Sequence, residues 1–383
     1  MNEKKLQFET ISVRGASGGD SVTGAISYPI YQSTTFKHPE LNKSTGYDYS
    51  RTNNPTREEV ERTICLLEEG KEALAFSTGV AAITACFHLF KPGDHIIVSE
   101  DLYGGTFRLF NDFYSVFGIK STFVDTTSLD KIKEAITDET KAIFIETPSN
   151  PLMRVSDISD ISYLCKKNKL TLIVDNTFLT PYFQKPLLLG ADIVIHSGTK
   201  FLGGHNDVLS GFLIANDTDI INKLRVVQNS TGATLSAFDS WLLLRGLKTL
   251  SIRLDKSQEN AILIANYLKR NENVEKVYYV GLEDHEGYDV NIVQSTGYGS
   301  MISFKVKKVS LVAKLLKKLE VISFAESLGG VETLITYPYT QTHVDMPNDL
   351  KQRLGVDERL LRLSVGIENI NDLLDDLKSV LGE

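Results

Sequence analysis

The sequence predicts an α/β fold built on a large, mostly parallel sheet, followed by a smaller α+β unit. Apolar strands alternate with amphipathic helices from residue 56 onward. The strands are continuous apolar runs, such as "KAIFIET" and "LTLIVDN", which are typical of a sheet covered on both faces. After about residue 246 the order changes, and runs such as "GSMISFKV" and "LLRLSVGIE" indicate strands of a second, smaller sheet.

Three regions follow from this pattern: an N-terminal arm over residues 1–55, a large domain over 56–245 and a C-terminal α+β domain over 246–383. The arm is rich in Gly, Ser, Thr and Tyr and has little periodic pattern, as in "STGYDYSRTNNPTR". We expect such a segment either to wrap its own domain or to reach a neighbouring subunit.

The individual elements are predicted by the spacing of apolar residues. In the large domain, helices are expected at "TREEVERTICLLEEG", "GVAAITACFHLF", "GGTFRLFNDFYSVFG", "SLDKIKEAI" and "VSDISDISYLCKKN". Strands are expected there at "EALAFST", "DHIIVSE", "STFVD", "KAIFIET", "LTLIVDN" and "DIVIHS". In the C-terminal domain "VEKVYYVG" indicates a further strand, while "LVAKLLKKL" and "NINDLLDDLKSVL" indicate helices.

Composition limits the classes of function. Of 383 residues, 42% are hydrophobic and 23% are charged, which is typical of a globular protein. The net charge of −8 argues against nucleic acid as the main partner. The N-terminus has no apolar signal segment and no apolar run approaches a membrane span. Cys65, Cys86 and Cys165 have no metal-ligand spacing, so we expect no metal and reduced thiols in a cytoplasmic protein.

Two polar residues follow apolar strands at positions where chemistry is expected. In open α/β sheets, ligands bind at the carboxyl ends of the strands. Lys200 lies in "DIVIHSGTKFLGGHNDV", where a partly desolvated amine would have a lowered pKa and become a usable nucleophile. Asp175 closes the apolar run "LTLIVDN", and its carboxylate either faces a protonated ring nitrogen or serves as a helix cap or salt-bridge partner.

Other strand ends carry groups suited to a flat, phosphorylated ligand. The "STG" turn before "VAAITA" begins a helix, whose first amides at Gly79 and Val80 suit a phosphate, although Ser77 and Thr78 can also act only as caps. The hydroxyls of Ser197 and Thr199 flank Lys200 and would reach the same phosphate.

Two further residues stand at these strand ends with open alternatives. Tyr103 would stack on a ring or pack beneath a loop. Asn150, in "TPSNP", would bind a ligand or only form a turn.

These parts together predict pyridoxal 5′-phosphate (PLP) as the cofactor. One rim of the predicted sheet carries an amine that can react with the aldehyde of PLP and a carboxylate that can face its ring nitrogen. The same rim carries an aromatic side chain that can stack on the ring and a turn that can bind the phosphate. A nucleotide-binding protein is the alternative, but neither G-x-G-x-x-G after the first strand nor G-x-x-x-x-G-K-[ST] is present.

The motifs "YDYSRTNNPTR", "SEDLYGGTFRLF", "IETPSNPL", "VDNTFLTPYFQKPLLLGADIVIHSGTKFLGGHNDV" and "FAESLGGVETLITYP" resemble those of the Cys/Met metabolism, or trans-sulfuration, family of PLP enzymes. The resemblance covers almost the whole chain. It implies fold type I, the aspartate-aminotransferase-like fold, amino-acid substrates and a homotetramer of two active dimers. It also implies roles: Lys200 as the covalent link and proton carrier, Asp175 as the ring-nitrogen partner, and Tyr103 stacked on the ring. The remaining implied cofactor and substrate contacts are Tyr49 and Arg51 on the phosphate of the adjacent subunit, Gly79, Val80, Ser197 and Thr199 on the phosphate, and Asn150, Glu326, Ser327 and Arg362 around the substrate.

The same resemblance favours one reaction. Methionine γ-lyases typically have a cysteine where this chain has Gly105. Glu326 stands where γ-synthases and many γ-lyases have an acid facing the distal amino group of the substrate. The resemblance therefore favours cystathionine γ-synthase, with cystathionine γ-lyase, cystathionine β-lyase and O-acylhomoserine sulfhydrylase as alternatives. A non-catalytic binding module is disfavoured because Lys200, Asp175 and Tyr103 are all present.

Overall fold

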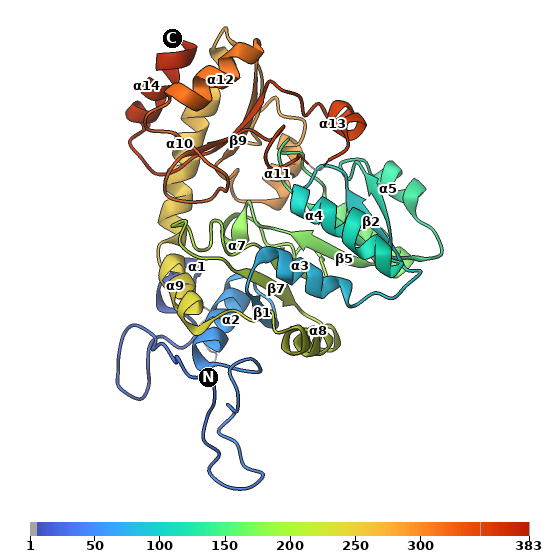
Figure 1. Cartoon of the computed structure of the whole chain (residues 1–383), viewed down its shortest axis with the longest axis vertical. Coiled ribbons are helices and arrows are strands. Elements are labelled where there is room, and N and C mark those ends of the chain that lie inside the picture. The colour runs from blue at the N-terminus through green and yellow to red at the C-terminus, as the bar shows by residue number, and fades with distance from the viewer. Residues whose placement is uncertain (1–5, 345, 383) are drawn as a thin grey trace.

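The computed structural model describes residues 6–344 and 346–382, which form two sheets with helices packed around them (Figure 1). The larger sheet has seven strands. In spatial order they are β1 (Glu72–Phe76), β7 (Gly211–Ala215), β6 (Ile193–His196), β5 (Thr171–Asp175), β4 (Thr140–Glu146), β2 (His95–Ser99) and β3 (Lys120–Val124). Only β7 runs antiparallel to its neighbours, β1 and β6. The predicted mostly parallel sheet is confirmed.

Helices cover both faces of this sheet. They are α2 (Pro55–Leu67), α3 (Gly79–Phe87), α4 (Gly104–Arg108), α5 (Leu129–Ala135), α6 (Ile158–Asn168), α7 (Thr180–Phe183) and α8 (Thr218–Thr231). Successive residues of β5 alternate between two apolar cores: Leu172 and Val174 belong to one, and Ile173 belongs to the other. This alternation explains why the strand sequence is continuously apolar.

Local sequence sets where these helices begin and end. Thr78 caps α3 by accepting a hydrogen bond from the amide of Ala81, and Asp217 caps α8 in the same way. Gly232 ends α8 in the left-handed region. The segment predicted as one helix after Tyr103 is instead α4 followed by a π-helical turn (Leu109–Phe113) and a 3-10 turn (Tyr114–Phe117).

The second sheet contains β10 (Ser323–Phe324), β11 (Leu334–Thr336), β12 (Leu360–Ser364), β9 (Met301–Val306) and β8 (Val274–Tyr278). Its helices are α11 (Tyr288–Gln294), α12 (Val309–Lys318), α13 (Asn348–Leu354) and α14 (Ile370–Leu381). Two more helices, α9 (Ala237–Leu247) and α10 (Leu250–Arg270), connect the two sheets (Figure 1). A third apolar core lies between this sheet and its helices.

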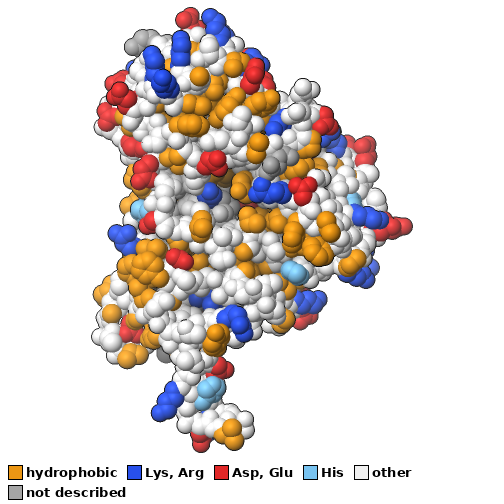
Figure 2. All heavy atoms as spheres, in the orientation of Figure 1, with side chains coloured by type: hydrophobic (Ala, Val, Ile, Leu, Met, Phe, Trp, Pro, Cys, Tyr) orange, Lys and Arg blue, Asp and Glu red, His pale blue; other side chains and the backbone are white. Residues whose placement is uncertain are grey.

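The N-terminal region has two parts. The short helix α1 (Phe8–Arg14) packs on the body, where Ser12 Oγ donates to the carbonyl of Leu247. The following segment, up to the start of α2, forms loops that extend away from the sheet (Figure 1) and protrude from the surface (Figure 2). Most of its side chains are exposed.

Two features relate to the expected reduced thiols and to the expected absence of a membrane span. The three cysteines are buried and free. Among the described helices, none combines the length and apolarity needed to cross a bilayer.

Candidate active site

The predicted lysine and aspartate lie at the same rim of the large sheet. β5 and β6 are parallel neighbours with Asp175 opposite Ile195, so the turn after β6 that carries Lys200 begins beside Asp175. Thr177 connects the two strand ends: its hydroxyl donates to Asp175 Oδ1 and accepts the amide of Ser197 at 2.9 Å. Thr177 was not among the predicted site residues, although its place two residues after Asp175 is typical of a hydrogen-bonded turn.

The Lys200 amine points toward the C-terminal domain. Its Nζ donates to Ser327 Oγ at 2.8 Å. Burial, and then the charge of Arg362, lower the pKa of Lys200 to about 8, while Glu326 acts in the opposite direction. Ser327 has a φ of 102°, a left-handed conformation that non-glycine residues rarely adopt. This conformation lets Ser327 contact Lys200 through its hydroxyl and Arg362 through its carbonyl.

Arg362 is a fully buried cation in the middle of β12, with 1% of its surface exposed. Its Nη1 donates to Asn150 Oδ1 at 2.7 Å and its Nη2 to the carbonyl of Ser327 at 3.1 Å. Burial lowers the pKa of Arg362 to about 10. Its Nε is buried and has no hydrogen-bond partner within the described residues. A buried guanidinium with neutral partners and one free donor suits a carboxylate ligand.

Asp175 shares its rim with a second buried carboxyl group. Glu146 ends β4 directly opposite Asp175, and both residues are buried. Burial raises the pKa of Asp175, and burial together with the charge of Asp175 raises that of Glu146 well above its usual range. Glu146 Oε2 also accepts the amide of Tyr103 at 3.0 Å, so it fixes the turn that carries the predicted ring-stacking residue. Glu146 was not predicted as a site residue because its place beside Asp175 depends on strand register.

Tyr103 and Glu326 are exposed at this rim. Tyr103 has 41% of its surface exposed and stands at the start of α4. Glu326 precedes Ser327 and lies near two cations, Lys200 and Arg362. Its negative charge offsets part of the lowering of their pKa values that burial causes. The rim is therefore open to a ligand on the side of these two residues.

The predicted phosphate turn lies at the start of α3. A Cβ at Gly79 would lie 2.8 Å from Ser197 Cβ, so only glycine permits the close approach of α3 to the turn after β6. The amides of Gly79 and Val80 belong to the first turn and have no partner among the described residues. Thr199 Oγ1 exchanges hydrogen bonds with the backbone of Ser210, at 2.9 and 3.2 Å, and so is already anchored.

Tyr49 and Arg51 lie apart from this cluster. Arg51 stacks over the Tyr49 ring at 5.3 Å and donates to Asn229 Oδ1 on α8 at 3.1 Å. Both side chains are exposed. The structure thus brings together Lys200, Ser327 and the residues around Arg362, and it leaves the two arm residues outside.

The arrangement fits pyridoxal 5′-phosphate. Lys200 supplies a partly buried amine with a lowered pKa for the aldehyde. Both hydrogen bonds that the described residues make to Asp175 go to Oδ1, which leaves Oδ2 for a ring nitrogen. The start of α3, next to Ser197, supplies unpaired amides for the phosphate.

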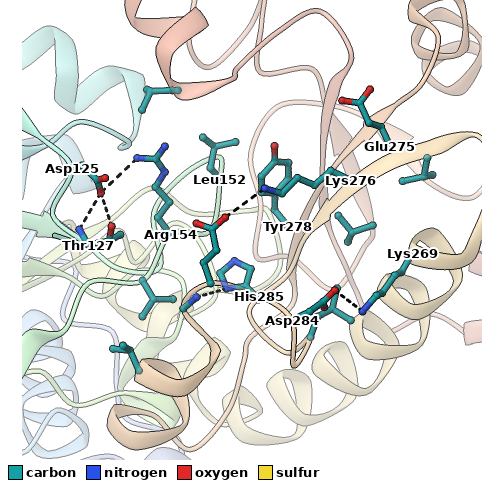
Figure 3. A pocket seen from close by; sticks show the side chains of 18 residues that line it. Asp125, Thr127, Leu152, Arg154, Lys269, Glu275, Lys276, Tyr278, Asp284 and His285 are labelled. Carbon is teal, nitrogen blue, oxygen red and sulfur yellow. Dashed lines mark hydrogen bonds and ion pairs between the residues drawn. The ribbon is translucent and has the colours of Figure 1, made fainter.

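A pocket of about 620 Å³ lies elsewhere, between the β3–α5 region and the C-terminal sheet (Figure 3). Its lysines and arginine face carboxylates: Lys269 pairs with Asp284 at 2.7 Å, and Arg154 lies 3.7 Å from Asp125. None of the predicted site residues lines it. Within the described residues, no group of His, Cys, Asp or Glu is arranged to hold a metal ion.

Comparison with known proteins places the chain in a family. Residues 9–382 match the family model described as Cys/Met metabolism PLP-dependent enzyme. The chain is 48% identical to cystathionine γ-synthase/O-acetylhomoserine (thiol)-lyase of Bacillus subtilis, over 97% of this chain and 96% of that protein. It is 46% identical to cystathionine β-lyase of Lactococcus lactis subsp. cremoris, over 98% of each.

A solved structure, cystathionine γ-lyase from Lactobacillus plantarum complexed with L-serine, superposes with a TM-score of 0.95. Its sequence is 43% identical, and the match covers 98% of this chain and 99% of that one. The predicted fold type I architecture and the predicted PLP cofactor are confirmed. The chain belongs to the Cys/Met metabolism family of PLP-dependent enzymes, the trans-sulfuration family.

Proposed function

We propose that this enzyme is a cystathionine γ-synthase, which replaces the acyl group of an O-acylhomoserine with the sulfur of cysteine. The position of the Lys200 amine carries the proposal: it is partly buried, 2.8 Å from Ser327 Oγ, and within electrostatic reach of Arg362 and Glu326. A γ-replacement needs a base that moves protons along the substrate, a cation for the α-carboxylate and a group that recognises the distal end. These side chains supply all three.

In this proposal each residue of the rim has one task. The bound coenzyme supplies an electron sink that acidifies the substrate protons. Arg362 and Asn150 bind the α-carboxylate, and Ser327 orients the Lys200 amine. Lys200 moves protons at Cα and Cβ, since its lowered pKa leaves part of it neutral near pH 7. Asp175 faces the ring nitrogen and Tyr103 covers the ring and assists the leaving group, while Gly79, Val80, Ser197 and Thr199 hold the phosphate.

The arm completes the site in an oligomer. We propose that Tyr49 and Arg51 contact the phosphate bound by a neighbouring chain, within a homotetramer of two active dimers. Their exposure supports this assignment, as does the hydrogen bond of Arg51 to Asn229 on α8 rather than to the Lys200 cluster. The three free, buried thiols support a cytoplasmic location.

Elimination from cystathionine is the second candidate, because relatives with that activity are nearly as similar as the synthase. A lyase would use the same lysine, arginine and aspartate, and would release a thiol product from cystathionine. Sulfhydrylation, in which sulfide replaces cysteine as the nucleophile, differs only in the second substrate.

Product analysis with purified enzyme separates these reactions. The enzyme is offered O-acetyl- or O-succinylhomoserine with cysteine, the same esters with sulfide, and cystathionine alone. We expect cystathionine from the first mixture at the highest rate. Pyruvate or 2-oxobutyrate from cystathionine, without any synthesis, would refute the synthase assignment and establish a lyase.

A further inference from the structure

His343 is a buried histidine at the edge of the site, in the loop that follows β11. Its side chain is 0% exposed, whereas Val344 beside it is 56% exposed. His343 Nε2 lies 3.1 Å from the carbonyl oxygen of Asn150, and Nδ1 lies 2.8 Å from Thr342 Oγ1. The carbonyl of Asn150 can only accept, so Nε2–H donates to it, and the carbonyl of Leu102 also faces the ring. Burial lowers the pKa of His343 to about 4, so the ring stays neutral near pH 7.

Asn150 connects this histidine to the buried arginine. Its backbone carbonyl accepts from His343, and its side-chain Oδ1 accepts from Arg362 Nη1 at 2.7 Å. The loop also reaches the turn of the ring-stacking residue: a Cβ at Gly104, next to Tyr103, would collide with the carbonyl oxygen of Thr342. One loop therefore contacts both the arginine's partner and the turn that carries Tyr103.

We propose that His343 is a positioning residue that sets the carboxylate-binding geometry of Arg362 by fixing Asn150. This inference rests on the proposed role of Arg362 and Asn150 in binding the α-carboxylate. Without the histidine, a buried carbonyl loses its donor, and the Asn150 segment must shift or admit water. A small displacement of Asn150 would turn the guanidinium away from the carboxylate and weaken the binding of the carboxylate.

The test uses the holoenzyme and two ligands that differ in one group, glycine and methylamine. Both are titrated against the visible absorbance of the bound coenzyme in the wild type and in His343→Phe. We expect the glycine Kd and the substrate KM to rise about tenfold in His343→Phe, with the methylamine Kd, the coenzyme content and kcat within about threefold of wild type. His343→Gln, whose amide can donate to the Asn150 carbonyl, should recover most of the glycine affinity.

His95 provides the matched control. It is buried at the opposite end of β2, with both ring nitrogens bonded to threonines at 2.8 and 2.9 Å. His95→Phe should lower thermal stability without changing the ratio of glycine to methylamine affinity. If His343→Phe does not fold, the glycine affinities of His343→Asn and His343→Gln are compared instead. The asparagine amide is too short to reach the Asn150 carbonyl, whereas the glutamine amide can donate to it.

Two negative outcomes are distinguishable. Unchanged glycine affinity in His343→Phe, equal glycine affinity in the Asn and Gln variants, or equal weakening of glycine and methylamine, overturns the role of His343. A wild-type enzyme that retains coenzyme but shows no preference for glycine over methylamine refutes the carboxylate site itself, and with it this part of the proposed function.

Discussion

The predicted site residues fall into two groups, one at the rim of the large sheet and one on the N-terminal arm. The two groups differ in how far they are buried and in how many hydrogen bonds hold them. At the rim, Lys200 and Arg362 are held by hydrogen bonds to segments far away in sequence, and Asp175 is held by its neighbour Thr177. On the arm, Tyr49 and Arg51 are exposed, and Arg51 is joined to the body through Asn229. Groups whose proposed chemistry needs desolvation thus lie inside one chain, whereas the proposed role of the arm residues requires a neighbouring chain.

The apolar residues of the arm agree with this contrast. Val22, Ile26 and Leu41 are between 83% and 89% exposed. Several exposed apolar side chains on one protruding segment favour a covered position in an assembly. The proposed neighbouring chain would provide that cover.

The largest effect is expected at the rim, from Lys200→Ala. The variant loses both the covalent link and the proton carrier, so the visible absorbance of the bound coenzyme should disappear and turnover should fall at least about 10³-fold. Absorbance spectra and initial rates measure both. Lys185→Ala, which removes a partly buried lysine paired with Glu69, is the control and should keep both signals. Ordinary turnover in Lys200→Ala would refute the assignment.

Arg362→Lys tests the carboxylate site within the same rim. Lysine keeps the charge but cannot make the paired bonds to Asn150 and Ser327, so kcat/KM should fall about 30-fold, mainly through KM. Arg359→Lys changes an ion-paired arginine just before β12 and should have little effect. A kcat/KM within twofold of wild type in Arg362→Lys would contradict the assignment.

The pKa of Lys200 predicts how fast the apoenzyme captures its coenzyme. Only the neutral amine attacks an aldehyde, and the pKa of Lys200 is lowered to about 8. The rate at which visible absorbance develops should therefore rise about tenfold per pH unit below pH 8 and level off above it. Stopped-flow absorbance between pH 6 and 9.5 measures this profile. A rate that still rises about tenfold per pH unit between pH 8 and 9.5 would indicate an ordinary surface lysine.

The arm is expected to give the smallest effect. Arg51→Ala should weaken coenzyme retention about tenfold through loss of one charged phosphate contact, and excess coenzyme should restore activity. Dilution to separate the subunits should remove the difference between variant and wild type. Lys37→Ala, another exposed cation on the arm, is the control. Equal coenzyme affinity in Arg51→Ala at all protein concentrations would leave the arm without this role.

Much of the fold was predictable because buried parallel strands have a plain signature. Each predicted strand of the large sheet is present. β7, the antiparallel strand, was not predicted, since it follows a glycine-rich loop and lies outside the strand–helix alternation. β10 and β11 have two and three residues, too few to produce a periodic pattern.

The site was predictable in its residue types but not in its connections. Lys200 and Asp175 could be found because each follows an apolar strand, where ligands bind. Glu146 and His343 could not, because their importance depends on which strand pairs with which and on which loop returns to Asn150. Strand register and loop packing are tertiary properties that spacing along the chain does not encode.

The burial of the three cysteines limits their reaction with the thiol and disulfide compounds that the proposed function implies. Burial raises the pKa of Cys65 to about 11 and that of Cys165 to about 12, and it also raises that of Cys86. Disulfide exchange requires a thiolate and access, and these side chains offer little of either. These three thiols should therefore resist forming mixed disulfides with cystine, the oxidised form of the proposed thiol substrate.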